Sequence, residues 1–384
     1  MQREYDKITG FADDLLAQST PQTPVWNKEI MLGHNQPGWN YIDGCMLKAI
    51  LDLYDAEKNQ KYLDFADAYI DYYVGDDGSI LGYNKDDFNS DSINEGKVLF
   101  TLHRLTGKEK YLKAINRLYS QLESQPRTKA GNFWHKLIYP NQVWLDGLYM
   151  TLPFYTEYET RFNGNKNIRD IFMQFTNVYE NMRDLDTGLF YHAWDEAREC
   201  FWADAETGLS KNFWSRSLGW YAMALLDSAE QMDETQFYER ETLIERLREV
   251  LDALLKAADP DTGMFWQVTV YASKEGNYLE TSASCAMAYS LMKGARLDFL
   301  PEYYYNYGKR IFDSIVKHKF IDGQTLCDIC LVAGLGVYSG KGDYEQRDGT
   351  FEYYISEPKV DNDAKGVAPF LMAFSEVLRK EAHT

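Results

Sequence analysis

The chain has 384 residues, a net charge of −19, and 45% hydrophobic and 15% aromatic residues. This composition supplies a large core and excludes a disordered chain. The strongly acidic balance argues against nucleic acid and anionic membranes as partners, because both are bound by basic surfaces. No apolar run approaches the roughly 20 residues that cross a bilayer. No apolar leader segment follows Met1, so we expect a cytoplasmic location, with export as the alternative if a leader was removed.

A short turn signal recurs along the chain. It consists of a glycine, often preceded by aspartate and followed by apolar or aromatic residues. The copies are centred on Gly78, Gly131, Gly188, Gly263 and Gly323. Such sequences favour a tight turn that leads into a short extended segment. The recurrence predicts a repeat protein with short β-like turns between its repeats.

Two kinds of helix are predicted between successive turns. Residues 61–66 and 110–114 are amphipathic, with one charged face. Helices that are apolar on nearly all sides are predicted to start near Tyr41, Ser92, Trp144, Ser217, Thr281 and Gly366. Six buried helices that alternate with outer ones predict an all-α fold, the (α/α)6 barrel, rather than an open solenoid of helix pairs. Since no Pro-, Gly- or Ser-rich linker divides the chain, we expect a single domain over residues 1–384.

Polar side chains gather where the buried helices start. If all six helices run the same way, these starts meet at one mouth of the ring. Capping of helix N-termini is the simple explanation for any one carboxylate. Histidines in equivalent places after two of the turns, with nearby cations, could hold an acidic substrate. The residues concerned are Tyr41, Asp91, His135, Lys136, Trp144, Asp146, His192, Arg216 and Trp220.

Carboxylate chemistry is the mechanism that these residues favour. The sequence contains no HExxH motif, glycine-rich phosphate loop or GxSxG elbow, so we expect neither a metal nor a cofactor. Asp146 and Asp91 begin neighbouring buried helices. Two carboxylates that share a site raise the pKa of one of them, which can then act as a general acid. The helix dipole acts in the opposite direction, and the sequence leaves this balance open.

Four segments of the chain resemble one known family. They are residues 143–150 (VWLDGLYM), 191–195 (YHAWD), 216–221 (RSLGWY) and 362–371 (NDAKGVAPFL). They resemble motifs of glycoside hydrolase family 105, the unsaturated rhamnogalacturonyl hydrolases, and they occur in family order. Many members carry GRGNGW where this chain has SRSLGW, so Ser217 and Leu218 depart from the pattern. This departure leaves the preferred leaving sugar open.

The resemblance implies an (α/α)6 barrel and a hydration reaction. The substrate would be a small oligosaccharide from lyase cleavage of pectin, with a 4,5-unsaturated uronic acid at its non-reducing end. Asp146 would protonate C4, water would add at C5 with the same aspartate as base, and the resulting hemiketal would open and release the sugar. Asp91 would be the second carboxylate. The family's substrate contacts match Tyr41, His135, Lys136, Trp144, His192, Arg216 and Trp220.

Three other functions remain open from the sequence. An unsaturated glucuronyl hydrolase would share the ring and the central aspartate. A ring-shaped glycosidase or epimerase would act on saturated sugars. A non-catalytic helical scaffold would explain the repeats but not the clustered polar residues. We expect a monomer or a weak homo-oligomer.

Overall fold

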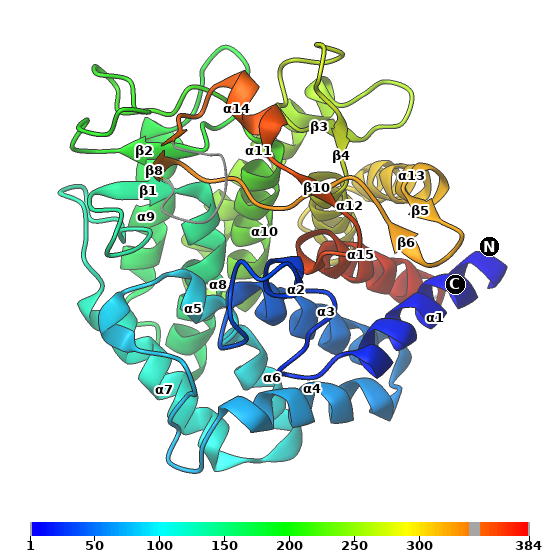
Figure 1. Ribbon diagram of the computed structural model, residues 1–384. Helices are drawn as coiled ribbons and strands as arrows, with labels where there is room; N and C mark the ends of the chain where they lie inside the picture. Colours follow the sequence, from blue (N-terminus) through cyan, green and yellow to red (C-terminus); the bar gives the residue numbers. More distant parts are fainter. Residues whose placement is uncertain (1, 338–345, 383–384) are drawn as a thin grey trace.

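The computed structural model describes residues 2–337 and 346–382, and its helices form two concentric layers (Figure 1). The inner layer consists of α3 (Tyr41–Glu57), α5 (Asp91–Asn94), α6 (Lys97–Thr106), α8 (Leu145–Phe162), α10 (Ser215–Gln231), α12 (Thr281–Arg296) and α15 (Ala364–Ala382). Each predicted buried helix is present within a few residues of its expected start, and the second is divided into α5 and α6. The ring closes because α15 packs against α3.

Six helices form the outer layer. They are α1 (Gln2–Gln18), α4 (Gln60–Tyr73), α7 (Glu109–Ser124), α9 (Ile168–Asn181), α11 (Phe237–Ala257) and α13 (Glu302–His318). Inner and outer helices alternate along the chain, which confirms the predicted (α/α)6 barrel. The short helices α2 (Lys28–Met31) and α14 (Phe351–Ser356) lie outside this alternation.

Small residues let the inner helices approach one another closely. A Cβ atom added to Gly44 of α3 would lie 2.5 Å from the Cα of Glu95, at the break between α5 and α6. A Cβ on Gly219 of α10 would lie 2.9 Å from the Cβ of Ala286 in α12. Any larger residue at these two positions would push neighbouring helices apart, so the glycines fix the diameter of the ring.

The strands are short and occur as antiparallel pairs. They are β1 (Gln142–Trp144) with β2 (Ala193–Asp195), β3 (Phe265–Trp266) with β4 (Leu279–Glu280), β5 (Phe320–Ile321) with β6 (Thr325–Leu326), β7 (Ile329–Cys330) with β10 (Lys359–Val360), and β8 (Gly336–Val337) with β9 (Gln346–Arg347). The five turn glycines have φ between +74° and +104°, a region that favours glycine. The predicted β-like turns are therefore confirmed.

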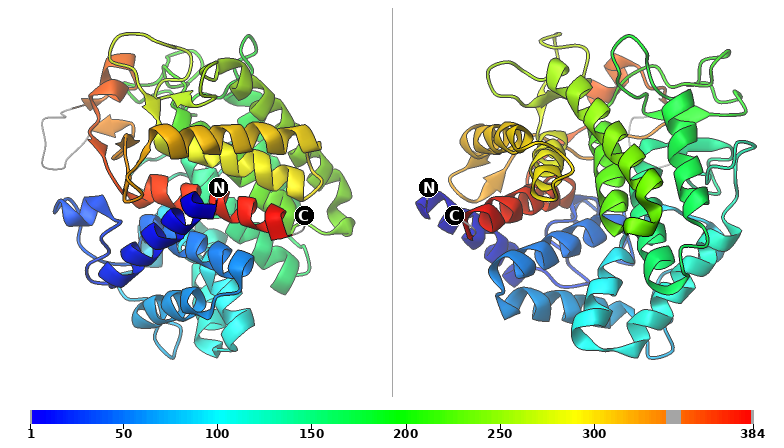
Figure 2. Two further views of the ribbon diagram at one scale, coloured as in Figure 1. Left: turned by 90° about the vertical axis from the view of Figure 1, so that its right-hand side faces the viewer. Right: turned by 180° about the vertical axis from the view of Figure 1, so that it is seen from behind.

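The first and last helices lie side by side, as both views of Figure 2 show. The hydroxyl of Tyr5 in α1 donates to Glu381 of α15 at 2.9 Å, and Phe11 packs edge-to-face on Phe320. The first residues of α3, α5 and α8 line one cavity, and the C-terminal halves of α3, α8, α10, α12 and α15 line another. No helix in the described residues is both long and apolar enough to cross a membrane.

Candidate active site

A cavity of about 390 Å³ opens at the mouth where the inner helices start. Its wall combines the beginnings of α3, α5 and α8 with the segment before α3 and the loops around β8 and β9. Six of the nine predicted site residues line it, namely Tyr41, Asp91, His135, Lys136, Trp144 and Asp146. The structure thus brings together in one cavity residues that are more than 100 positions apart in the sequence.

Asp146 is held by a link between two successive repeats. The strand pair β1–β2 sets Trp144 opposite Ala193, and the amide of Leu145 donates to the carbonyl of His192 at 3.1 Å. The carboxylate of Asp146 consequently lies 3.1 Å from Nε2 of His192. On its other side, Nδ1 of His192 lies 2.7 Å from the hydroxyl of Tyr354. Carboxylate, imidazole and phenol therefore form one hydrogen-bonded row that leads away from the cavity.

The pKa of Asp146 is lowered from its ordinary value. Burial is the largest influence and raises the pKa, but the charge and hydrogen bond of His192, together with His135, outweigh it. The balance that the sequence left open is therefore decided in favour of the ionised carboxylate. Asp146 is therefore ionised in the free protein, and a general-acid role would require it to gain a proton first.

Asp91 forms an ion pair with a different partner. Its carboxylate lies 2.6 Å from Nζ of Lys136, which also lines the cavity. Burial would lower the pKa of Lys136, but the neighbouring Asp91 outweighs this effect and raises it. Asp91 and Asp146 thus share one cavity, yet each carboxylate has its own nitrogen partner.

Three aromatic rings form a flat section of the wall. The His135 ring stacks on Trp144 with centroids 4.5 Å apart and planes 17° apart, and Tyr139 stacks on Trp144 at 5.0 Å. Burial lowers the pKa of His135 to about 4, so the ring is neutral at pH 7. Gly147 leaves room for it, because a Cβ there would lie 2.9 Å from the Nδ1 of His135. Such a wall suits the apolar face of a sugar ring.

The other three predicted residues lie behind the cavity wall. His192 is fully buried between Asp146 and Tyr354. Nη1 of Arg216 donates to the carbonyl of Cys330 at 2.6 Å. Trp220 is 3% exposed and stacks on Tyr149 at 4.9 Å. In the described structure these three side chains position and pack other groups, and their contact with a substrate stays a prediction.

Sequence reasoning missed several residues of the wall. Glu29 forms an ion pair with Lys365 at 2.9 Å, and this cation outweighs the effect of burial and lowers the pKa of Glu29. Arg347 and Tyr139 also line the cavity. Lys365 lies in the recognised 362–371 segment and could have been proposed. Glu29 and Arg347 stand in segments without a motif, so only the fold reveals them.

Comparison with known proteins identifies the family. The model of "Glycosyl Hydrolase Family 88" matches residues 16–381, so the chain belongs to this family of glycoside hydrolases. A solved glycoside hydrolase of family 105 from C. acetobutylicum ATCC 824 is 41% identical, with a TM-score of 0.84 over 94% of this chain and 98% of that one. The predicted resemblance to family 105 is thereby confirmed.

Two curated relatives extend the comparison. A "24.9 kDa protein in picA locus" of Rhizobium radiobacter is 36% identical over 238 residues, which cover 60% of this chain and 98% of the relative. The "Unsaturated rhamnogalacturonyl hydrolase YesR" of Bacillus subtilis is 26% identical over 67% of this chain and 72% of the relative.

Within residues 2–337 and 346–382, no group of three or more His, Cys, Asp or Glu side chains could hold a metal ion.

Proposed function

We propose that this hydrolase removes a 4,5-unsaturated uronic acid from the non-reducing end of oligosaccharides, by hydrating the C4=C5 bond with Asp146 as general acid and base. The observation that carries the proposal is the position of Asp146, in the wall of a 390 Å³ cavity and 3.1 Å from His192. The similarity to YesR supports the rhamnogalacturonan type of substrate, because that relative is named as a rhamnogalacturonyl hydrolase.

The low pKa of Asp146 sets the first requirement of the reaction. A uronate that enters the cavity brings a second negative charge, which raises the pKa of Asp146 by like-charge repulsion. His192, at 3.1 Å, is a neighbouring group through which a proton can reach the carboxylate. Binding of the acidic substrate thus favours the protonated form of Asp146, which the reaction uses as its general acid.

In the proposed reaction, Asp146 gives one proton to the substrate and regains one from water. Asp146 transfers its proton to C4, and positive charge develops at C5, where the ring oxygen stabilises it. The oxygen of a water molecule bonds to C5 while that water returns a proton to the Asp146 carboxylate. The product is a hemiketal at C5. Its ring opens to a ketone at C5 and a hemiacetal at C1, and the collapse of this hemiacetal to an aldehyde breaks the glycosidic bond and releases the neighbouring sugar as an alcohol. The usual retaining and inverting geometries, which depend on the separation of two carboxyl groups, do not apply to this route.

Cations and aromatic rings of the same wall fit the rest of the substrate. Lys136 and Arg347 supply positive charge for the uronate carboxylate. The stacked rings of His135, Trp144 and Tyr139 offer a flat surface for the sugar. The clustering of six predicted residues in one cavity counts against a non-catalytic scaffold, for which scattered positions were expected.

A panel of unsaturated disaccharides tests this proposal. Hydration destroys the conjugated double bond, so turnover is followed as loss of its ultraviolet absorbance. We expect the fastest loss with the unsaturated rhamnogalacturonan disaccharide. Faster turnover of a glucuronate-containing glycosaminoglycan disaccharide would replace the proposed substrate by the glucuronyl alternative. Release of sugar with unchanged absorbance would overturn the hydration mechanism itself.

A further inference from the structure

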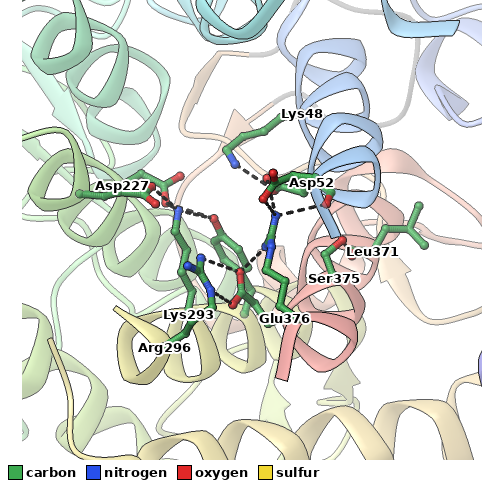
Figure 3. A network of polar contacts seen from close by, with 12 residues as sticks. Lys48, Asp52, Asp227, Lys293, Arg296, Leu371, Ser375 and Glu376 are labelled. Atoms are coloured by element: carbon green, nitrogen blue, oxygen red, sulfur yellow. Dashed lines mark hydrogen bonds and ion pairs between the residues drawn. The ribbon is translucent and has the colours of Figure 1, made fainter. Parts of the chain in front are cut away.

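A second cavity, of about 510 Å³, lies at the opposite mouth of the ring. Its wall comes from the C-terminal halves of α3, α8, α10, α12 and α15 and from one face of α6. The candidate active site lies at the opposite ends of α3 and α8, and the two cavities share no lining residue. Figure 3 shows part of the polar network that surrounds the second cavity, including Lys48, Asp52, Lys293 and Glu376.

The wall of the second cavity is unusually rich in cations. Its 21 residues include eight Lys or Arg and six Asp or Glu. The whole chain has only 40 Lys or Arg in 384 residues and a net charge of −19. One fifth of its cations therefore line one cavity, which reverses the local sign of the charge.

Pairing accounts for all but two of these cations. The pairs are Lys48–Asp52, Lys58–Asp55, Arg161–Glu157, Lys293 with Asp227 and Glu230, Arg296–Glu376, and Arg379 with Glu376, Asp52 and Asp55. Within residues 2–337 and 346–382, neither Lys97 nor Arg104 forms an ion pair with a carboxylate, although the charge of Arg104 acts on Glu157 from a greater distance. Six cations thus match six carboxylates, and two positive charges remain.

The two remaining cations belong to one face of α6. Lys97, Thr101 and Arg104 are spaced by four and three residues, and all three line the cavity. Arg104 is exposed, whereas only 9% of Lys97 is exposed. The face therefore offers a deep ammonium, a hydroxyl and an outer guanidinium, all of which can donate hydrogen bonds.

The helix dipole does not explain why Lys97 is here. Cations favour the C-terminal ends of helices, but Lys97 is the first residue of α6. Its Nζ donates to the carbonyl of Tyr149 at 2.6 Å and lies 3.4 Å from the centroid of the Tyr149 ring. That carbonyl has no helical partner, since residue 153, four positions on, is a proline without an amide hydrogen. Lys97 is thus held in place, and its ammonium group can still donate further hydrogen bonds.

We propose that the second cavity binds a small dianion, held between Lys97, Thr101 and Arg104. Two unpaired positive charges match two negative charges, and a cavity of this volume admits a phosphate group or a six-carbon diacid. The proposal does not depend on the reaction assigned to the first cavity.

The ionisation of Lys97 supports the proposal. Burial lowers the pKa of Lys97 to about 7, so its charge is incompletely compensated by the protein. The groups that act on it come from α3 (Cys45, Lys48), α10 (Asp227) and α12 (Lys293). A bound anion would stabilise the ammonium, and binding should therefore weaken as the pH rises above 7.

Titration calorimetry with inorganic phosphate and with glucarate tests this site. Sodium chloride at equal ionic strength and neutral glucose serve as ligand controls. We expect saturable binding of at least one dianion, weakened about tenfold or more in Lys97→Met and in Arg104→Gln, since each loses a charge-assisted hydrogen bond. Phosphate and glucarate together distinguish a compact dianion from an extended one.

Lys136→Met is the matched control, because it removes a cation of the first cavity and should leave this binding unchanged. If Lys97→Met does not fold, binding by Arg104→Gln alone tests the proposal, because Arg104 is exposed and its substitution should not disturb folding. Absence of dianion binding, equal binding by the wild type and Arg104→Gln, or loss of binding only in Lys136→Met would overturn the proposal.

Discussion

His192 lies 3.1 Å from Asp146 because β2 pairs with β1 immediately before α8 begins. The two residues are 46 positions apart in the sequence and come from successive repeats. The backbone bond from Leu145 to His192 fixes their register independently of the side chains. The local structure between repeats thus determines which histidine lies beside Asp146.

Asp146→Asn should abolish hydration while the ring stays folded. The amide has nearly the same shape as the carboxylate but can neither gain nor lose the transferred proton. General acid–base catalysis contributes about 10²- to 10⁴-fold, so a loss of that order is expected in the initial rate with an unsaturated disaccharide. Asp186→Asn, at an exposed turn, is the matched control and should retain full activity. An active Asp146→Asn variant would remove this residue from the mechanism.

Asp91→Asn should also reduce activity severely, for a different reason. Lys136 would lose the carboxylate 2.6 Å away, and burial would then lower its pKa. The positive charge available to the uronate would weaken, so KM should rise more than kcat falls. An unchanged KM in steady-state kinetics would show that Lys136 does not hold the substrate.

His192→Gln should move the acidic side of the pH–rate profile to higher pH. His192 is the main influence that lowers the pKa of Asp146, and burial, which raises that pKa, would remain. The carboxylate would then be protonated at a higher pH than in the wild type. The profile of kcat/KM against pH measures the shift. Tyr354→Phe, which keeps the histidine, should shift the profile less.

The folded protein should lose stability as the pH falls from about 6.5 to about 4. His135 has a pKa of about 4 when folded and an ordinary value of 6.5, so in this range the unfolded chain binds more protons. The contribution is about 3 kcal/mol at most. His135→Gln should reduce the slope of unfolding free energy against pH in urea titrations. A slope equal to that of the wild type would contradict the neutral histidine.

Lys97 and Pro153 should be energetically coupled. Lys97→Met leaves the Tyr149 carbonyl without a donor, at a cost of about 1–3 kcal/mol for a buried group. Pro153→Ala restores an amide at the helical position that this carbonyl would use. The loss caused by Lys97→Met should therefore be smaller in the Pro153→Ala background. Additive losses in a double-mutant cycle measured by denaturant unfolding would argue against this shared carbonyl.

The ring of helices could be predicted from hydrophobic periodicity, because each helix carries this pattern within its own stretch of sequence. A helix buried on all sides carries this information in its own residues, as 217–226 and 281–288 illustrate. The same argument placed Asp146 and Asp91 at one mouth, since both begin inner helices. The break between α5 and α6 was not predicted, because it depends on the contact of Gly44 with Glu95, 51 positions away.

The depth of each side chain in the ring could not be predicted. Arg216 and Trp220 belong to a recognised segment, but Arg216 donates a hydrogen bond to Cys330 of the distant strand β7, and Trp220 lies one helical turn further inside. Glu29 carries no sequence signal, because its role depends on Lys365, 336 positions later. Such pairings are properties of the closed ring rather than of any segment.

The pairing of Glu29 with Lys365 also determines when the candidate active site can exist. During synthesis Glu29 emerges early, and its cation emerges only as α15, the last inner helix, is made. The amide of Ala364 likewise reaches back to the carbonyl of Trp26 at 2.7 Å. A nascent chain therefore has no finished cavity until α15 has left the ribosome, and the appearance of activity would mark ring closure.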